Sequence, residues 1–553
     1  MQTEWLYKKM FKRIYALLRS IVFFSGLIPI MLHASPKNTL VMAWSIDSIT
    51  SFDPAQSVEV VTSELLTNIC SALVQYDPHN STEIQPAMAK SWDVLDGGKK
   101  IVFHLRDDLK FDDGKLATAQ DLAWSMQRVV KLGLSYAQSL KDYGFTEDNV
   151  ETKIQALDAK TLQMQFDKLY PLRLILTVIG QSYASALLNR QKLEMHAVND
   201  DMGNKYLTTH SACVGPYKLV RWVPGERVVL EATQHYWGEA PKIERILILH
   251  VAESASQRFL LEKGVVDISR DLSSEDILDI EKQEGPLAIH RVLRPQSVYL
   301  SLNNKNVIFA NEKVRLAFRY LVDYDMLGKT VLKGIAIPRA SYMPLGIPGA
   351  LDEKEGVPFK LDLKKAKQLI KEAGYVNGFK TNLLIGSLSY MSSVAQIIQE
   401  NARKIGIELS IEKMSQAQLL NRVRGGNYDI AIMSWNTADP DGHASSWHHV
   451  FNPDPTFTKP YNMHLAWRAG YYDAKANKMV MDALFEEDKS KRFEQYRELQ
   501  NYILNHGPMA YLFQTYYTIG VGSAVKKWVW NSFRLYYNKA EKYMQSNDER
   551  SHM

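Results

Sequence analysis

A run of aromatic and polar residues follows an apolar segment near residue 430 and is well suited to contact a ligand. Residues 428–434 are mostly apolar and predict a buried strand, which is followed by Trp435, Asn436, Thr437 and Asp439. In an open α/β sheet, ligands bind in the crevice beyond the carboxyl ends of the strands. An indole ring can stack on a ligand, and amide, hydroxyl and carboxylate groups can hydrogen-bond it. We therefore expect residues 435–439 to contact a small ligand.

Three histidines shortly after this segment could serve a metal or a metal-bearing ligand. His443, His448 and His449 flank Trp447, and imidazoles are common metal ligands. A metal site would also need a further ligand and groups that orient the rings. The sequence does not place these groups, so we expect polar residues of a surface loop and no metal site.

Sequence motifs of catalysis are absent. The chain contains no G-x-S-x-G, H-E-x-x-H, C-x-x-C, P-loop or G-x-G-x-x-G pattern. Carboxylates near Asp439 could pair as a general acid and base, but only at a distance that the sequence does not give. We therefore expect a binding protein and no cofactor, with a secreted enzyme as the less favoured alternative.

Composition and charge indicate a folded chain of several domains without a bias toward nucleic acid. The 553 residues are 46% hydrophobic and 23% charged, with a net charge of +5. Residues 1–34 contain five basic residues and one acidic residue, so the remaining chain has 61 basic and 60 acidic residues and a net charge of +1. Nucleic acid is an unsuitable partner because its phosphates require a basic face.

The first 34 residues have the pattern of a secretory signal peptide. A basic segment precedes residues 21–32, which are apolar and interrupted by Gly26 and Pro29, and Ala34 then offers a small residue for cleavage. The apolar segment is shorter than the ~20 residues of a spanning helix, which disfavours an uncleaved anchor. We expect cleavage after Ala34 and a mature protein in an exported compartment.

Two cysteines, Cys70 and Cys213, remain in the chain. An oxidising compartment permits a disulfide between them, but free buried cysteine is also common. The sequence leaves both possibilities open.

Helical and strand periodicities alternate along the chain, which predicts an α/β fold. Thr118 and Asp121 resemble a capping box that opens a helix reaching Val130. Further helices are expected at residues 363–373 and 392–405, and strands at 101–105, 161–166, 407–411 and 428–434. Glycines at residues 96–99 and 110–114 indicate turns.

Several sequence blocks together resemble the large extracytoplasmic solute-binding proteins of family 5, the oligopeptide- and dipeptide-binding receptors of ABC importers. The longest block runs from Pro86 to Asp121. The resemblance extends from about Thr39 to about Trp530, and other blocks on both sides of the longest one occur in the order of the family. They are Asp53-Pro54-Ala55, Gly215-Pro216-Tyr217, Tyr236-Trp237, Leu302-Asn303-Asn304, Val314-Arg315, Ala373-Gly374-Tyr375 and Tyr428-Asp429.

The resemblance implies a two-lobed periplasmic-binding-protein fold of the type II-like, large peptide-binding subclass. Lobe 1 would comprise residues 35–290 with an extra subdomain at about 66–195, and lobe 2 residues 291–504. Residues 505–553 would return to lobe 1 and end in a loose tail. Closure of the lobes on a ligand would present a monomeric periplasmic protein to an inner-membrane ABC permease and its ATPase subunits.

Peptides are the ligand that the resemblance favours, and nickel chelates, haem, sugars and opines are the alternatives. In peptide-binding relatives, a turn of lobe 2 and a loop of lobe 1 pair with the peptide main chain. The loop would be residues 58–63 here, including Val60, Val61, Thr62 and Ser63.

One position departs from the family pattern. Relatives place an amine-binding Asp three residues after the Trp, where this chain has Ala438, and Asp439 follows one position later. Either Asp439 takes that role, or residues 439–441 form only a structural turn.

Overall fold

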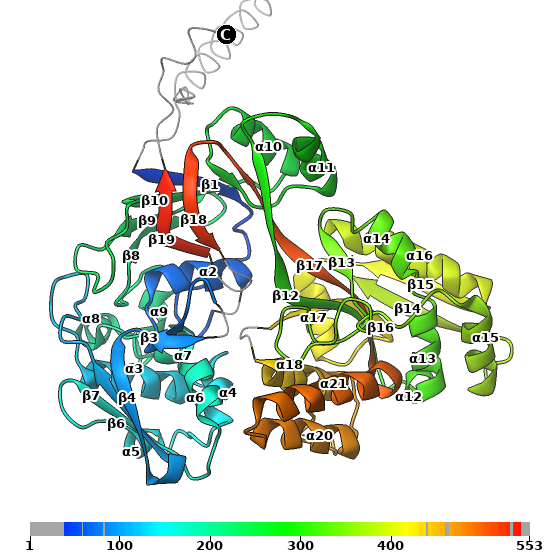
Figure 1. The fold of residues 1–553 in the computed structure, drawn as a ribbon, viewed down its shortest axis with the longest axis horizontal. Helices are drawn as coiled ribbons and strands as arrows, with labels where there is room; N and C mark the ends of the chain where they lie inside the picture. Colours follow the sequence, from blue (N-terminus) through cyan, green and yellow to red (C-terminus); the bar gives the residue numbers. More distant parts are fainter. Residues whose placement is uncertain are drawn as a thin grey trace, which may run out of the picture.

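Two lobes lie side by side in the computed structural model and are joined by two long strands (Figure 1). The structure describes residues 38–57, 59–80, 83–180, 182–437, 441–458, 464–530 and 535–542. The joining strands are β12 (Ala288–Leu302) and β17 (Met509–Val521). The predicted mixture of helices and strands is confirmed.

One mixed sheet continues through both lobes because β12 and β17 belong to it along their whole length. Its order is β15-β14-β16-β12-β17-β11-β1-β10-β9-β8, and β13 (Ala336–Pro338) also pairs with β17. The two long strands are antiparallel, from Ala288 opposite Val521 to Ser301 opposite Met509, with a register shift between Leu293 and Ser297. The chain therefore enters lobe 2 along β12 and returns along β17, and we propose that the division into domains follows these crossings.

Lobe 1 surrounds the first half of this sheet. Apolar residues on its strands and on the adjoining helix α2 form a core that includes Met42, Leu65, Ile69, Leu230 and Ile519. Its elements are β1 (Thr39–Trp44), α2 (Val60–Ile69), α8 (Arg190–His196), α9 (Asn204–Leu207), β8 (Tyr217–Val223), β9 (Arg227–Ala232), β10 (Arg245–His250), α10 (Ser254–Glu262), β11 (Ile268–Ser269), α11 (Ser274–Lys282), β18 (Val525–Trp530) and β19 (Leu535–Lys542).

The subdomain of lobe 1 has its own sheet, in the order β4-β5-β7-β6, and a separate core. Thr118 caps α3 through the predicted box, because its side chain accepts a hydrogen bond from the Asp121 amide. The predicted turn at residues 96–99 is also confirmed, with positive φ at Gly97 and Gly98. The elements are β2 (Val74–Tyr76), β3 (Ile84–Pro86), β4 (Ala89–Leu95), η1 (Asp96–Gly98), β5 (Lys100–Leu105), α3 (Ala119–Leu132), α4 (Ala137–Lys141), α5 (Val150–Lys153), β6 (Ile154–Ala156), β7 (Thr161–Gln165), α6 (Leu172–Ile179) and α7 (Ser182–Ser185).

Lobe 2 is an α/β layer in which β14 (Phe379–Ile385) runs parallel to both β15 (Ile407–Lys413) and β16 (Ile430–Asn436). These three strands end at the same edge, which is where a ligand crevice is expected. The helices are α12 (Val307–Ala310), α13 (Glu312–Tyr320), α14 (Tyr324–Lys329), α15 (Leu363–Glu372), α16 (Ser389–Lys404), α17 (Gln416–Arg424), α18 (Gly442–His449), α19 (Leu465–Arg468), α20 (Ala474–Phe485) and α21 (Lys489–His506). The helices predicted at 363–373 and 392–405 correspond to α15 and α16.

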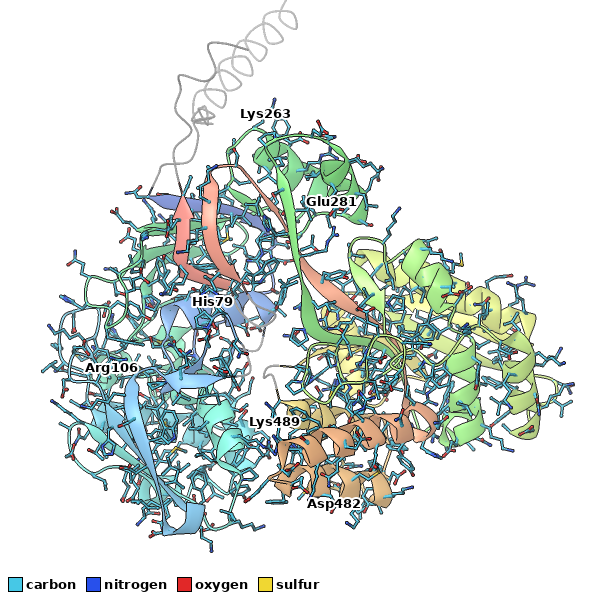
Figure 2. All side chains as sticks on the ribbon, in the orientation of Figure 1. His79, Arg106, Lys263, Glu281, Asp482 and Lys489 are labelled. Carbon is cyan, nitrogen blue, oxygen red and sulfur yellow. A yellow bond between two sulfur atoms is a disulfide. The ribbon has the colours of Figure 1, made fainter. Side chains whose placement is uncertain are left out.

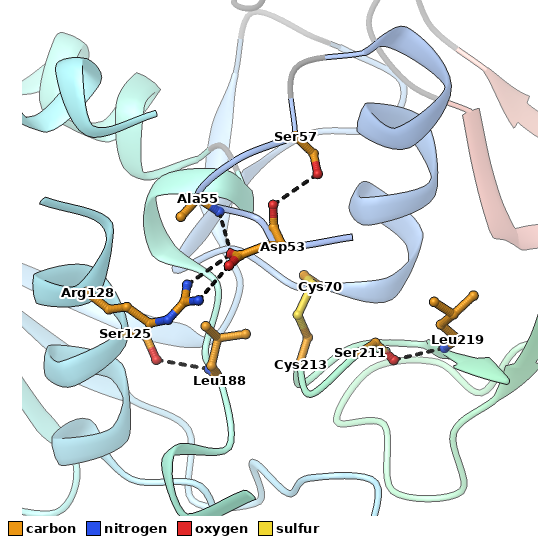
Figure 3. The surroundings of a disulfide bond; sticks show 10 residues. All are labelled: Asp53, Ala55, Ser57, Cys70, Ser125, Arg128, Leu188, Ser211, Cys213 and Leu219. Carbon is orange, nitrogen blue, oxygen red and sulfur yellow. Dashed lines mark hydrogen bonds and ion pairs between the residues drawn. A yellow bond between two sulfur atoms is a disulfide. The ribbon is translucent and has the colours of Figure 1, made fainter. Parts of the chain in front are cut away.

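A disulfide between Cys70 and Cys213 ties the end of α2 to the segment before β8 (Figure 3). The Cα atoms are 5.0 Å apart, and the Ser71 amide donates a hydrogen bond of 2.8 Å to the Val214 carbonyl beside them. The disulfide that the sequence left open is therefore present. It holds the helix whose first turn lies in the predicted ligand-contact segment.

Candidate ligand-binding site

The end of β16 carries two of the predicted ligand-contact residues. Trp435 and Asn436 still belong to the strand, opposite Ser297 and Gln296 of β12, and both side chains are half-buried. The sequence placed them beyond the strand end. That detail is wrong because pairing with the antiparallel neighbour β12 extends the strand by two residues.

The indole N–H of Trp435 is a buried donor without a partner in the described part of the chain. Its ring centroid lies 5.0 Å from that of His448, and its Nε1 is buried without a hydrogen-bond partner among the described residues. Buried donors normally have a partner, so an unpaired indole N–H at a strand end is a candidate contact for a ligand.

The amide and hydroxyl groups of Thr437 form hydrogen bonds to other residues of the protein. Its amide donates to the Pro295 carbonyl at 2.7 Å, and its buried hydroxyl lies 3.2 Å from that of Ser445. These bonds fix the exit of the chain from β16 against β12 and α18. Asp439, the predicted partner of a ligand amine, lies outside the described residues, as do Ala438 and Pro440.

The three histidines lie on α18 or at its end, which corrects the expectation of a surface loop. His443 and His449 are buried, and the pKa of each imidazole is lowered by burial, to about 4 for His443 and about 3 for His449. His449 Nδ1 lies 3.0 Å from the Tyr511 hydroxyl. Both rings are thus neutral at pH 7. No cluster of three or more metal-ligating side chains occurs within the described part of the chain.

Rings from three segments of lobe 2 gather beside these histidines. Trp447 stacks on Phe451 with a centroid distance of 4.1 Å, and the His464 ring lies 5.4 Å from Trp447. This aromatic cluster offers flat apolar faces and neutral imidazoles next to Trp435.

In lobe 1, the predicted contact segment forms the first turn of a helix and not a loop. Val60, Val61, Thr62 and Ser63 begin α2, while Val58 lies outside the described residues. The segment is helical because residues at helical spacing pack into the core of lobe 1, and the disulfide fixes its far end. Main-chain pairing of these residues as a strand is therefore excluded in this conformation.

The four residues differ in what they could offer a ligand. Val60 and Ser63 are half-buried, whereas Val61 and Thr62 are buried. The Thr62 hydroxyl has no partner among the described residues, and the Ser63 hydroxyl hydrogen-bonds Tyr136. Tyr136 stacks on Tyr183 at 4.3 Å, and burial raises its pKa well above the usual value, so the phenol stays neutral.

The lobes contact each other through side chains of α4, α6 and α18. Arg173 Nη1 of α6 lies 3.1 Å from Asp441 Oδ2 at the start of α18, and Nη2 donates to the Leu484 carbonyl at 2.8 Å. Asp142, at the end of α4, faces the Trp447 indole and His464. Burial raises the pKa of Asp142 and lowers that of His464.

Arg294 also belongs to this region, and nothing in the sequence singled it out. Its Nε donates to Asn436 Oδ1 at 3.3 Å, and its guanidinium lies 4.5 Å above the Tyr517 ring. A basic residue before a proline gives no signal of such a position, because residues 294, 436 and 517 meet only through the pairing of three strands.

One surface hollow lies away from these residues. It measures about 680 Å³ on α20 and α21 and contains none of the predicted contact residues; it is lined by Lys478, Met481, Asp482, Phe485, Glu486, Glu487 and Gln495. Figure 2 shows Asp482 at the edge of lobe 2 far from β16. Within the described residues, no helix has both the length and the apolar character needed to cross a membrane.

Solved structures of periplasmic binding proteins superpose on nearly the whole chain. The periplasmic binding protein DppA of Helicobacter pylori, in complex with the peptide STSA, has a TM-score of 0.75 at 23% identity, covering 91% of this chain and 98% of its own. The binding protein AgaA in complex with agropinic acid, from A. tumefaciens R10, has a TM-score of 0.76 at 22% identity, covering 92% of this chain and 100% of its own. The expected fold class is confirmed.

Relatives with similar sequences are also named as binding proteins. The probable D,D-dipeptide-binding periplasmic protein DdpA of Escherichia coli K12 is 29% identical over 508 residues, which are 91% of this chain and 93% of that protein. Heme-binding protein A of Haemophilus influenzae is 24% identical, over 86% of this chain and 87% of its own length.

The model of the bacterial extracellular solute-binding proteins, family 5 (middle), matches residues 83–457, well over half of the chain. This family binds small solutes for ABC transporters and is not a family of enzymes. The resemblance seen in the sequence blocks is confirmed, and the chain belongs to family 5 of the bacterial extracellular solute-binding proteins.

Proposed function

We propose that this protein is the periplasmic receptor of an ABC importer for short peptides. The observation that carries the proposal is the position of Trp435 and Asn436. Both are half-buried at the end of β16, where this strand pairs with β12, the strand that crosses between the lobes. This edge of lobe 2 holds the Trp435 indole N–H, which has no partner among the described residues, and the Asn436 amide, and both groups suit a ligand rich in hydrogen-bonding atoms. The similarity over 91% of the chain to a relative named a probable D,D-dipeptide-binding protein supports a peptide ligand.

The lobes would act as a clamp. A ligand that touches both lobes stabilises the closed arrangement only by binding it more tightly than the open one. The closed form would dock on a permease whose ATPase subunits are separate chains. Val60, Ser63 and Asp439 remain proposed contacts, and Asp439 would receive the peptide α-ammonium group.

Ligand identity is tested by native mass spectrometry of gently purified protein, followed by release of the bound molecule. A ladder of masses that correspond to short peptides supports the proposal. A single non-peptide mass contradicts the peptide assignment. Sequencing the amino terminus of the exported protein tests cleavage after Ala34, since the mature chain should begin at Ser35.

A second experiment tests Asp439 directly. Asp439→Asn should weaken binding of peptides with a free amino terminus and leave N-acetylated peptides unaffected. Equal effects on both forms would contradict the proposed role of Asp439.

A flat non-peptide ligand is the second candidate. The aromatic cluster of Trp447, Phe451 and His464 next to Trp435 favours it, because flat rings stack on such faces. A haem-binding relative covers 86% of this chain. Absorbance of the purified protein in the visible range would separate this candidate from the first.

A further inference from the structure

Arg294 occupies an unusual position where the chain crosses between the lobes. It lies in β12 within the register shift between Leu293 and Ser297, where pairing with β17 is interrupted. The Gln514 side chain donates to its carbonyl at 2.9 Å, which holds the backbone in place. The side chain is half-buried.

The guanidinium group of Arg294 uses only one of its N–H donors in hydrogen bonds to described residues. Its Nε donates to the neutral amide oxygen of Asn436 at 3.3 Å, and Cζ lies 4.5 Å from the centroid of the Tyr517 ring. Its charge also acts on the Tyr390 phenol at the start of α16. Among the residues that the structure describes, no carboxylate forms an ion pair with Arg294, and neither terminal nitrogen has a hydrogen bond.

Two buried arginines of lobe 1 serve as a comparison, because each places its guanidinium against a carboxylate. Arg270 lies 4.0 Å above the Trp44 ring, and its terminal nitrogens donate to both oxygens of Glu64 at 2.5 and 2.7 Å. Arg128 binds Asp53 in the same two-pronged way (Figure 3). Arg294 has an aromatic ring beneath it, as Arg270 does, but pairs with no carboxylate within the described ranges.

Arg291, on the same strand, gives an internal comparison. Its guanidinium lies 5.9 Å from the Tyr516 ring, and its Nη2 forms an ion pair of 2.8 Å with Glu281. Arg291 and Arg294 thus lie three residues apart on β12, and each guanidinium lies over one of the adjacent tyrosines Tyr516 and Tyr517 of β17. They differ in that Arg291 pairs with Glu281, whereas Arg294 pairs with no acidic residue in the described part of the chain.

We propose that Arg294 binds a carboxylate of the ligand, the C-terminal carboxylate of a short peptide. This inference rests on the proposed peptide function. The planar guanidinium can donate two parallel hydrogen bonds to a carboxylate, and the Tyr517 ring keeps the plane in a fixed orientation. Asn436 already accepts a hydrogen bond from Nε, and both terminal nitrogens, which bond no described residue, can then bind the ligand. One end of the peptide then lies at the crossing of β12 and β16.

The test compares peptides that differ only in this carboxylate. Calorimetric titration of the purified protein uses di- and trialanine as free acids and as C-terminal amides. A two-pronged, charge-assisted contact predicts that the wild type binds the acids about 10- to 100-fold more tightly than the amides. Arg294→Gln should weaken binding of the acids by this factor and leave the amides unchanged. Arg294→Lys keeps the positive charge but not the two parallel donors of the planar guanidinium, so the loss of affinity for the acids should be intermediate.

Arg291→Gln is the matched control and should bind acids and amides like the wild type. Equal binding of acids and amides by the wild type would overturn the role of Arg294 while leaving the peptide function intact. Binding of neither form would overturn the peptide function and this inference with it. A parallel loss for acids and amides in Arg294→Gln would show a structural role and likewise overturn the inference.

Discussion

Arg173 of α6 and Asp441 at the start of α18 form an ion pair of 3.1 Å between the two lobes. Both side chains are about three-quarters shielded from solvent, with 24% and 20% exposed. Arg173 also donates to the Leu484 carbonyl at the end of α20, where the helix dipole favours a cation. One side chain of lobe 1 therefore contacts two helix ends of lobe 2.

Arg173→Gln should make ligand dissociation faster, because it removes an attraction present only while the lobes are together. For a partly exposed pair we expect dissociation about 3- to 10-fold faster, measured by stopped-flow fluorescence. Arg190→Gln is the control, since Arg190 pairs with Glu194 within a single helix. An unchanged dissociation rate in Arg173→Gln would show that the contact does not stabilise closure.

Trp435→Phe tests the unpaired indole N–H. The substitution keeps a ring against His448 and removes one donor, so affinity for the ligand should fall by about 2- to 10-fold. The free energy of unfolding should stay the same, because Nε1 has no partner in the described protein. Trp222→Phe removes another buried N–H, in lobe 1, that has no hydrogen-bond partner among the described residues, and it should leave affinity unchanged. Wild-type affinity in Trp435→Phe would exclude a hydrogen bond from Nε1 to the ligand.

The disulfide between Cys70 and Cys213 should stabilise lobe 1. It closes a loop between positions 143 residues apart, which limits the unfolded chain, and its loss should cost about 2–5 kcal/mol. Urea unfolding with and without dithiothreitol measures the difference. In the double variant Cys70→Ala, Cys213→Ala, the reductant should have no effect. A wild type that is equally stable when reduced would contradict the prediction.

His443 and His449 should make the protein less stable in acid. Both pKa values are lowered in the folded protein, to about 4 and about 3, whereas the unfolded chain takes up protons near 6.5. The free energy of unfolding should therefore be highest above pH 6.5 and fall as the pH drops toward 4. The contribution of His443 is on the order of 3 kcal/mol, from 1.36 kcal/mol per pH unit.

Unfolding by urea at pH 7.5, 6, 5 and 4 measures this dependence, and carboxylates contribute to it as well. The variants His443→Gln and His449→Gln isolate the imidazoles, because each should flatten the decline between pH 6.5 and 4. An exposed histidine, in the variant His79→Gln, provides the control. Identical pH profiles for wild type and both buried variants would contradict the assignment.

Local patterns in the sequence determined many of the elements. The capping box at Thr118, the turn at Gly97 and Gly98, and the helices α15 and α16 depend on neighbouring residues, so periodicity and turn chemistry predicted them. Joint sequence blocks also identified the family and with it the fold. The ends of β16 and the helical start of α2 were missed because pairing with β12 and packing on the lobe 1 core decide them.

The site itself depends on tertiary structure. Sequence could nominate Trp435 and Asn436, because strand ends and polar side chains are visible in one dimension. It could not nominate Arg294 or Arg173, whose partners lie 142 and 268 residues away along the chain. Whether a cation is paired depends on which carboxylates surround it in space. The sequence by itself therefore determined the family and the fold and predicted a set of contact residues, and only the folded chain decided that Arg173 has a carboxylate partner whereas Arg294 has none among the described residues.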